Sequence, residues 1–347
     1  MKALRKIKPA YGCMQLVDIP EPVTAPGHVK VRVEYCGICG SDMKFYHWTQ
    51  RPGMSIPIPV TFGHEYSGVV TEIGEGVTNI QVGDRVVSET PEIFCGKCEQ
   101  CRTGNQLLCK SKRSIGYQVD GAMAEYICIR QELIHKIPDS VSFEEAAVCE
   151  PASVTAHAVY DKAHVQPGDT VLIFGPGLIG LLTLEHAKCC GAKVILAGLS
   201  KDEERLAIGK KLGADVVIKT DQANVRDEVM KLTDGRGVDF VFECTGVGSV
   251  LDEALGTLKR MGKMVLIAFF KPGDIPIEMW NTVVNNEVEI VGSYGQRYGN
   301  WERVLKLMDM KKIDVRAVTT HIFDLEDWEK GFGITERQEG LKVLLKP

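Results

Sequence analysis

The chain has 347 residues, which is long for a single domain, so two domains are expected. Its formal net charge of −5 gives no electrostatic basis for binding nucleic acid or an anionic membrane surface. No apolar run reaches the roughly 18 residues that span a bilayer, and no signal-peptide core follows the basic start, so we expect a cytoplasmic protein. Because that compartment is reducing, the 12 cysteines indicate metal binding and not a disulfide framework.

The part of the chain up to about residue 150 has the pattern of a β-rich unit with many turns. Residues 29–35 alternate apolar and polar side chains, as in a half-buried strand. Residues 67–73 and 84–88 follow the same pattern and are bounded by glycines. The prolines at 52, 57 and 59 keep the segment before His64 irregular.

The pattern changes near Pro151. A short apolar run at 170–174 is typical of a buried parallel strand, and a helical pattern follows at 178–190. Further strands are predicted at 193–197, 215–218, 238–243, 263–268 and 288–291, and further helices at 201–212 and 301–310. This alternation predicts a doubly wound parallel sheet and therefore an α/β fold.

Residues 62–68 contain the first candidate for chemistry. His64 and Glu65 are adjacent, so an extended backbone would point them to opposite sides, whereas a tight turn beside the flanking glycines lets both converge. Cys39 offers a thiolate from upstream, and Glu150 offers a second carboxylate from downstream. Such a set suits a catalytic zinc that keeps one coordination position open. A buried histidine beside a surface glutamate is the alternative, and these residues alone do not decide between the two.

Four closely spaced cysteines are the most specific signal in the chain: Cys95, Cys98, Cys101 and Cys109. Two-residue spacers let successive thiolates surround one ion, and the fourth cysteine closes a tetrahedron. With no open position, such a site holds a loop together and performs no chemistry. Structural zinc is the favoured interpretation; an iron–sulfur cluster also uses four thiolates and is the alternative.

A glycine-rich loop follows the predicted strand at 170–174 and opens the next helix. Its residues are Gly175, Pro176, Gly177, Leu178, Ile179 and Gly180. In this context the glycines permit a tight turn and the close approach of a pyrophosphate, which the helix N-terminus attracts. The loop therefore predicts a dinucleotide site.

The end of the second strand of such a unit indicates which dinucleotide is bound. An acidic residue there binds the ribose hydroxyls of NAD and repels a 2′-phosphate, but this chain has Gly198. Ser200, Lys201 and Arg205 are then candidates to contact the phosphate of NADP. The alternative is that an acidic residue at 202 or 203 serves NAD from a longer loop, so both cofactors stay open.

With both sites in view, the chain resembles the zinc-dependent medium-chain dehydrogenase/reductase family over essentially its full length. The motif from Gly63 to Val77 looks like the family's zinc signature, and the cysteine quartet looks like its structural-zinc lobe. Glu65 and Glu150 match the polyol dehydrogenase branch, which includes sorbitol, threonine, butanediol and sugar-alcohol-phosphate dehydrogenases. The resemblance implies a GroES-like catalytic domain from residues 1–153 and 292–347, with a Rossmann domain at 154–291 inserted in it.

The resemblance also implies a reaction, the reversible oxidation of a secondary alcohol of a polyol or polyol phosphate with NAD or NADP. Zinc held by Cys39, His64 and Glu65, with Glu150 as a fourth ligand or a partner of bound water, lowers the pKa of the alcohol. The two carboxylates make the site oxygen-rich, so Mn²⁺ is a second candidate metal. Ser41 is expected to accept the alcohol proton and pass it outward. His47 is a candidate for the next member of this relay, and an exposed histidine in a loop is the alternative.

Other residues near these motifs have less specific roles. Asp42 is either a partner that orients His64 or a turn-capping carboxylate. Arg297 and Tyr298 resemble the substrate-facing stretch of sorbitol dehydrogenase, and a surface salt bridge is the alternative for Arg297. We expect a homodimer or homotetramer, formed through an edge strand near residues 263–276, where Phe269 and Phe270 would otherwise face water.

Two other functions remain open at this point. The same site would bind an amino alcohol, as in a threonine dehydrogenase. A non-enzymatic NADPH-binding relative is the second, and the complete metal-ligand set counts against it.

Overall fold

The computed structural model describes residues 1–49, 55–270 and 280–347. They form two compact units, and the chain passes between them more than once. The first unit comprises Met1–Glu150, Arg297–Met310 and Thr319–Pro347; the second comprises Pro151–Gln296 and Lys311–Val318. Both ends of the chain therefore contribute to the first unit.

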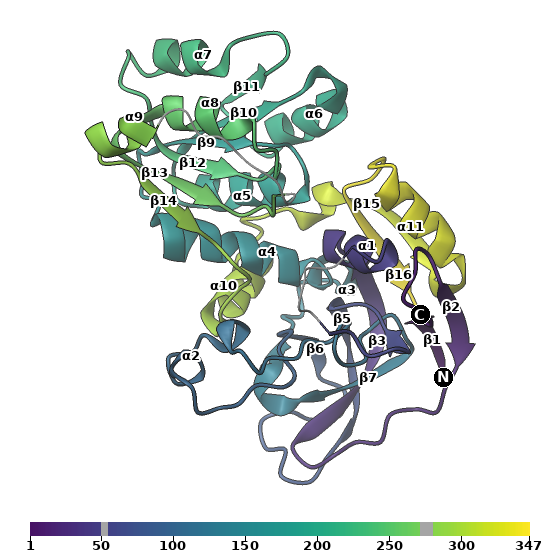
Figure 1. The fold of residues 1–347 in the computed structure, drawn as a ribbon. Coiled ribbons are helices and arrows are strands. Elements are labelled where there is room, and N and C mark those ends of the chain that lie inside the picture. Colours follow the sequence, from purple (N-terminus) through teal and green to yellow (C-terminus); the bar gives the residue numbers. More distant parts are fainter. Residues whose placement is uncertain (50–54, 271–279) are drawn as a thin grey trace. The chain divides into compact units, whose positions relative to one another are not determined.

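The first unit is built mainly from antiparallel strands (Figure 1). Its strands are β1 (Lys2–Lys6), β2 (Met14–Asp18), β3 (His28–Ile38), β4 (Val60–Thr61), β5 (Glu65–Ile73), β6 (Arg85–Ser88), β7 (Tyr126–Arg130), β8 (Ile134–Lys136), β15 (Thr319–Asp324) and β16 (Lys342–Lys346). Its helices are α1 (Gly40–Tyr46), α2 (Glu99–Arg102), α3 (Phe143–Ala146), α10 (Tyr298–Asp309) and α11 (Trp328–Glu336), and α4 (Cys149–Ala156) crosses into the second unit.

The largest sheet of this unit has the strand order β15-β16-β3-β5-β6-β8, with β7 also paired to β3. The C-terminal strand β16 runs antiparallel to β3, so that Val343 lies opposite Ile38. On its other side β3 pairs with β5, which places Gly37 opposite Glu65. The alternating side chains of β3 bury Val29, Val31 and Val33 in the core, as the sequence pattern predicts.

The second unit is a six-stranded parallel sheet with the order β11-β10-β9-β12-β13-β14. Its strands are β9 (Thr170–Phe174), β10 (Lys193–Gly198), β11 (Val216–Lys219), β12 (Val238–Glu243), β13 (Leu258–Leu266) and β14 (Glu289–Gly292). Its helices are α5 (Leu178–Cys189), α6 (Glu203–Lys211), α7 (Val225–Leu232), α8 (Val250–Gly256) and α9 (Trp280–Asn285). They cover both faces of the sheet (Figure 1).

This strand order reverses direction at β9, as in a Rossmann fold, so the predicted α/β fold class is confirmed. All five residues of β9 are buried, in agreement with its continuous apolar sequence. The strand β13 begins at Leu258 and not at residue 263 as predicted. Its first half contains Lys259, Arg260 and Met261, the last with φ 59°. Because these residues are mostly polar and the backbone is irregular there, the first half lacks the apolar pattern from which a strand is predicted.

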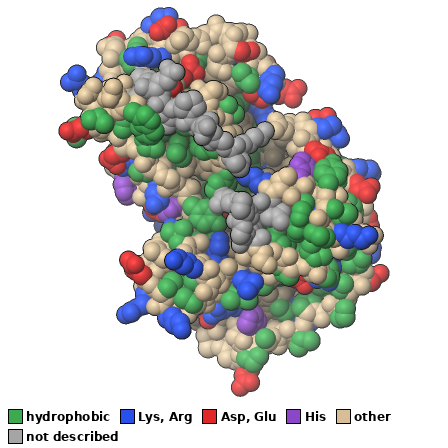
Figure 2. Space-filling model, in the orientation of Figure 1, with side chains coloured by type: hydrophobic (Ala, Val, Ile, Leu, Met, Phe, Trp, Pro, Cys, Tyr) green, Lys and Arg blue, Asp and Glu red, His purple; other side chains and the backbone are tan. Residues whose placement is uncertain are grey.

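Basic and acidic side chains both lie on the surface of the protein (Figure 2). On the face shown in Figure 2, basic and acidic side chains are interspersed and form no large patch of one sign. Within the described ranges, no helix is both long and apolar enough to cross a membrane. The edge predicted for oligomer contacts lies partly outside the described residues, at 271–276; Phe269, which lies inside them, is 49% exposed.

Candidate active site and metal centres

A tight turn at Gly63 allows the adjacent residues His64 and Glu65 to direct their side chains to the same place. Gly63 has φ 95°, and a Cβ atom there would lie 2.6 Å from the Cys36 sulfur, so only glycine fits. His64 follows in irregular backbone, and Glu65 is the first residue of β5. The turn therefore sets the direction of His64 independently of the strand that directs Glu65.

Cys39 reaches the same place from the N-cap position of α1. The ligand atoms of Cys39, His64 and Glu65 all lie within 4.8 Å of one another. His64 and Glu65 are 4% and 1% exposed, so the imidazole and the carboxylate are held away from solvent. A thiolate, an imidazole and a carboxylate at this spacing fit a divalent zinc ion with one position left open.

Lys342, on the C-terminal strand β16, completes this cluster and was not predicted from the sequence. Its ammonium pairs with Glu65 Oε2 and also donates to the carbonyl of Ile38 at 3.0 Å. Both side chains of the pair are 1% exposed. Burial alone would lower the pKa of Lys342, but the charges of Glu65 and Cys39 raise it above its ordinary value. The lysine therefore stays charged and offsets the buried negative charge.

Asp42 lies behind His64 and is fully buried. Its Oδ2 accepts a hydrogen bond from the backbone N–H of Cys39 at 2.9 Å, which fixes the start of α1. Its Oδ1 lies 3.7 Å from His64 Nδ1 and has no hydrogen-bond partner among the described residues. Burial lowers the pKa of His64, but Asp42 and Cys39 outweigh it and raise this pKa well above its usual value. Asp42 thus caps the turn and lies beside the imidazole without a hydrogen bond to it.

Ser41 is the second residue of the same helix and lies next to the ligand set. Its hydroxyl donates to Cys39 Sγ at 3.1 Å and lies 2.6 Å from the hydroxyl of Tyr117. Tyr117 Oη is also 2.7 Å from each ring nitrogen of His64. Burial, with the charges of Cys39 and Asp42, raises the pKa of Tyr117 well above its usual value, so the phenol stays neutral. Tyr117 lies in a loop without a recognisable motif, and no signal in the sequence pointed to it.

Two predicted site residues lie in other surroundings. His47 Nε2 contacts Glu336 Oε1 at 2.7 Å, and the Tyr11 ring lies 5.4 Å from the imidazole. The structure thus pairs His47 with Glu336, and Ser41 contacts Tyr117 instead. Glu150 is 9% exposed on α4 and is not one of the three residues with converging ligand atoms, although its charge acts on Tyr117 and Lys342.

The cysteine quartet forms a second cluster. Its sulfur–sulfur distances are 3.9 Å for Cys95–Cys101, 3.5 Å for Cys98–Cys101 and 3.6 Å for Cys95–Cys109. A tetrahedral ion with zinc–sulfur bonds near 2.3 Å requires edges of about 3.8 Å, so four thiolates fit zinc here. Backbone N–H groups of Lys97 and Cys98 lower the pKa of Cys95 to about 6, which favours the thiolate.

The glycine-rich loop joins β9 to α5. Gly175 has φ 100°, and a Cβ atom at Gly180 would lie 1.9 Å from the Gly175 carbonyl oxygen. Gly177 is the N-cap of α5, where a Cβ atom would meet nothing within 4 Å. The first glycine thus makes the turn, the last allows close packing, and the middle one leaves open space at a helix N-terminus, as a pyrophosphate requires. Pro176, Leu178 and Ile179 complete the loop and begin α5.

Gly198 ends β10 and packs against the glycine-rich loop. A Cβ atom there would lie 2.8 Å from the ring of Pro176, so no larger side chain fits in this backbone. Ser200 donates its N–H and its hydroxyl to Asp221 Oδ1, both at 2.9 Å. Lys201 is exposed and Arg205 is half-buried. A carboxylate, supplied by Asp221, therefore stands beside the predicted phosphate-binding residues.

Arg297 and Tyr298 begin α10 in the first unit. The Arg297 side chain donates through Nε to Asn105 Oδ1 at 2.5 Å, and Asn105 lies in the lobe that carries the cysteine quartet. Tyr298 is 57% exposed, and its ring lies 4.8 Å from that of His135. The sequence did not indicate the link between Arg297 and this lobe.

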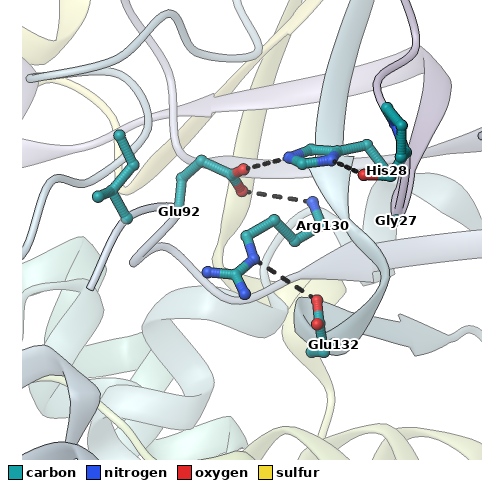
Figure 3. A pocket seen from close by; sticks show the side chains of 7 residues that line it. Gly27, His28, Glu92, Arg130 and Glu132 are labelled. Carbon is teal, nitrogen blue, oxygen red and sulfur yellow. Dashed lines mark hydrogen bonds and ion pairs between the residues drawn. The ribbon is translucent and has the colours of Figure 1, made fainter. Parts of the chain in front are cut away.

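A separate pocket of about 340 Å³ in the first unit contains none of the predicted site residues (Figure 3). Glu92 Oε1 lies 3.1 Å from His28 Nε2, and Glu92 Oε2 accepts the backbone N–H of Arg130 at 3.4 Å. The Arg130 guanidinium pairs with Glu132 at 3.5 Å. Because these charges pair with one another, the pocket is a less suitable centre for chemistry than the cluster around His64.

Comparison with known proteins agrees with this geometry. Residues 25–139 match the family described as alcohol dehydrogenase GroES-like domain, and residues 179–310 match the zinc-binding dehydrogenase family. The chain is 38% identical to a sorbitol dehydrogenase of Halalkalibacterium halodurans, over 100% of this chain and 99% of the relative. It is 36% identical to a D-arabitol-phosphate dehydrogenase of Enterococcus avium, over 100% and 97%. The crystal structure of 2R,3R-butanediol dehydrogenase from Bacillus subtilis superimposes with a TM-score of 0.90 at 34% identity, covering 100% and 99%.

Proposed function

This chain belongs to the zinc-dependent medium-chain dehydrogenase/reductase family, and from that premise we propose its reaction. The protein reversibly oxidises a secondary alcohol of a polyol or polyol phosphate to a ketone, with NAD or NADP as the hydride acceptor. The observation that carries the proposal is the convergence of Cys39, His64 and Glu65 within 4.8 Å. The sequence similarity to sorbitol and arabitol-phosphate dehydrogenases supports the polyol class.

Cys39, His64 and Glu65 would hold the catalytic zinc, and Glu150 would lie close to it. When bound, zinc polarises the alcohol oxygen and lowers the pKa of the alcohol. The proton that the alcohol loses would pass through Ser41, whose oxygen takes it up and releases its own hydroxyl proton towards solvent; this hydroxyl lies 3.1 Å from the Cys39 sulfur. Asp42 would influence the imidazole of His64 through its charge from 3.7 Å away, and Lys342 would balance the charge of Glu65. With two carboxylates nearby, Mn²⁺ is a further candidate for this site.

The cysteine quartet would hold the structural zinc, which needs no open position. The dinucleotide would bind with its pyrophosphate at Gly177 and the N-terminus of α5. The nicotinamide supplies a hydride acceptor for the carbinol carbon. Because residue 198 is glycine and not an acidic residue, no charge at this position repels a 2′-phosphate. Asp221 beside Ser200, however, supplies a carboxylate that can bind ribose hydroxyls. Both cofactors are therefore to be assayed.

Arg297 and Tyr298 would contact hydroxyl or phosphate groups of the substrate at the start of α10. The structural similarity to butanediol dehydrogenase supports a second candidate, the oxidation of a smaller alcohol such as 2,3-butanediol or threonine. A non-enzymatic role is the least favoured, because it gives no reason for the three converging ligands. We further propose that the protein works in the cytoplasm, where its 12 cysteines stay reduced, and that it forms a homodimer or homotetramer.

A single set of assays tests the proposed function. Sorbitol, arabitol, their phosphates, 2,3-butanediol and threonine are each offered with NAD and with NADP, and the metal content of the same sample is measured. We expect turnover of at least one polyol or polyol phosphate, and two metal ions per chain. A preparation that carries metal only at the quartet, or that oxidises threonine alone, contradicts the polyol assignment.

A further inference from the structure

Two hydroxyl groups stand side by side at the candidate active site. The oxygens of Ser41 and Tyr117 are 2.6 Å apart. Ser41 also contacts Cys39, and Tyr117 also contacts His64, so each hydroxyl touches a different residue of the same ligand set. A ligand that entered this site would therefore meet both oxygens together.

The hydrogen-bond directions define what each hydroxyl can offer. Ser41 donates its only proton to the Cys39 sulfur, so the contact with Tyr117 uses the phenolic proton, and Tyr117 donates to Ser41. Each hydroxyl has one donor and further acceptor capacity, so a ligand with two oxygens can replace this pair without leaving a polar group unsatisfied. A ligand with two oxygens gives each hydroxyl a partner of its own, whereas a ligand with one oxygen must share that oxygen between them.

The Tyr117 ring is fixed independently of its hydroxyl. Its centroid lies 4.6 Å from that of Phe45, which is 4% exposed on α1. Phe45 and Ser41 belong to the same helix, so the packing that holds the ring also fixes its distance from Ser41. The phenolic oxygen is thus held in place before any substrate binds.

We propose that Tyr117 is the specificity residue that recognises a second hydroxyl of the substrate, on the carbon next to the one that reacts. The inference rests on the proposed function, which places the reacting alcohol at Ser41. Neighbouring carbons of a polyol carry oxygens close enough to contact two hydroxyls that are themselves in hydrogen-bond contact. Tyr117 therefore selects vicinal diols and polyols over simple secondary alcohols.

The test compares two alcohols with the same carbon skeleton, 2,3-butanediol and 2-butanol. Tyr117→Phe removes the phenolic oxygen and keeps the ring against Phe45. We expect kcat/KM for the diol to fall roughly 10- to 100-fold, mainly through KM, because a buried hydrogen-bonding group is left without a partner. For 2-butanol we expect a smaller loss, so that the ratio of kcat/KM for the diol to that for 2-butanol falls roughly tenfold.

Tyr66→Phe is the matched control. It removes the hydroxyl of another buried tyrosine, which is 2% exposed on β5 and has no hydrogen-bond partner among the described residues. This variant should treat both alcohols as the original protein does. Metal content and the dissociation constant of the reduced cofactor should be unchanged in both variants.

Calorimetry provides a measurement that does not depend on turnover. In the complex with reduced cofactor, Tyr117→Phe should weaken binding of 2,3-butanediol about tenfold more than it weakens binding of 2-butanol. Equal losses for both alcohols, loss of metal, or no loss for either would overturn the proposal. If the original protein oxidises no polyol or diol, the proposed function fails, whereas the calorimetric comparison still decides whether Tyr117 recognises the second hydroxyl.

Discussion

Replacement of Lys342 by methionine tests whether the buried ion pair balances the charge of the candidate metal site. Methionine keeps an unbranched stem of similar length and removes only the ammonium. Glu65 is then left in a place where it is 1% exposed, with no counter-charge from the lysine. The carbonyl of Ile38 also loses its hydrogen bond from Lys342.

The size of the effect follows from these two contacts. Removal of one partner of a buried ion pair costs about 3–5 kcal/mol, because the remaining charge stays buried and unpaired. The lost hydrogen bond to Ile38 adds about 1 kcal/mol. We therefore expect metal-free Lys342→Met to lose about 4–6 kcal/mol of unfolding free energy. A bound divalent ion supplies the missing positive charge, so the loss in the metal-loaded protein should be only about 1–2 kcal/mol.

Urea unfolding of both forms at pH 7 measures these losses. The double variant Lys342→Met, Glu65→Gln removes both charges and should recover most of the stability of the metal-free protein. A loss below about 1 kcal/mol in the metal-free single variant would refute the reasoning, since a buried unpaired charge costs more than that. The same loss with and without metal would show that the ion does not bind beside Glu65.

Three other predictions concern the rest of the chain. Burial raises the pKa of Glu185 on α5 to about 7. The folded state therefore binds the carboxyl proton of Glu185 more tightly than the unfolded state does, and the free energy of unfolding falls as pH rises from about 4.5 through 7. Relative to Glu185→Gln, the original protein should lose about 2.5 kcal/mol between pH 5 and pH 8 in urea unfolding; parallel pH profiles would contradict this. Gly198→Asp should not create a preference for NAD, because its Cβ would lie 2.8 Å from Pro176. We expect it to weaken binding of both cofactors roughly tenfold in fluorescence titrations, and tighter NAD binding would argue against the clash. Cys109→Ser should lower the zinc content from two ions per chain to one and lower Tm, whereas Cys128→Ser should change neither.

The parts of this fold that the sequence predicts are those with local patterns. The strands at 170–174 and 238–243 were predicted at their observed bounds, because each is a continuous or alternating apolar run. The quartet and the glycine-rich loop have fixed spacings along the chain. Lys342 could not be predicted in the same way, since it meets Glu65 only after β16 pairs with β3, across 277 residues of sequence. Tyr117 reaches Ser41 from a loop, across 76 residues, and has no motif around it.

The proposed catalytic role of the ion beside Cys39, His64 and Glu65 is tested most directly by measuring turnover and zinc content on the same sample. A chelator strips the metal, the residual zinc is counted, and X-ray absorption at the zinc edge identifies the ligands of the reloaded protein. We predict that turnover disappears when the ion bound by one sulfur and several nitrogen or oxygen atoms is removed, and that added zinc restores it. The ion bound by four sulfurs should contribute only to stability. Full turnover without the first ion, or a single four-sulfur site in the active protein, would contradict it.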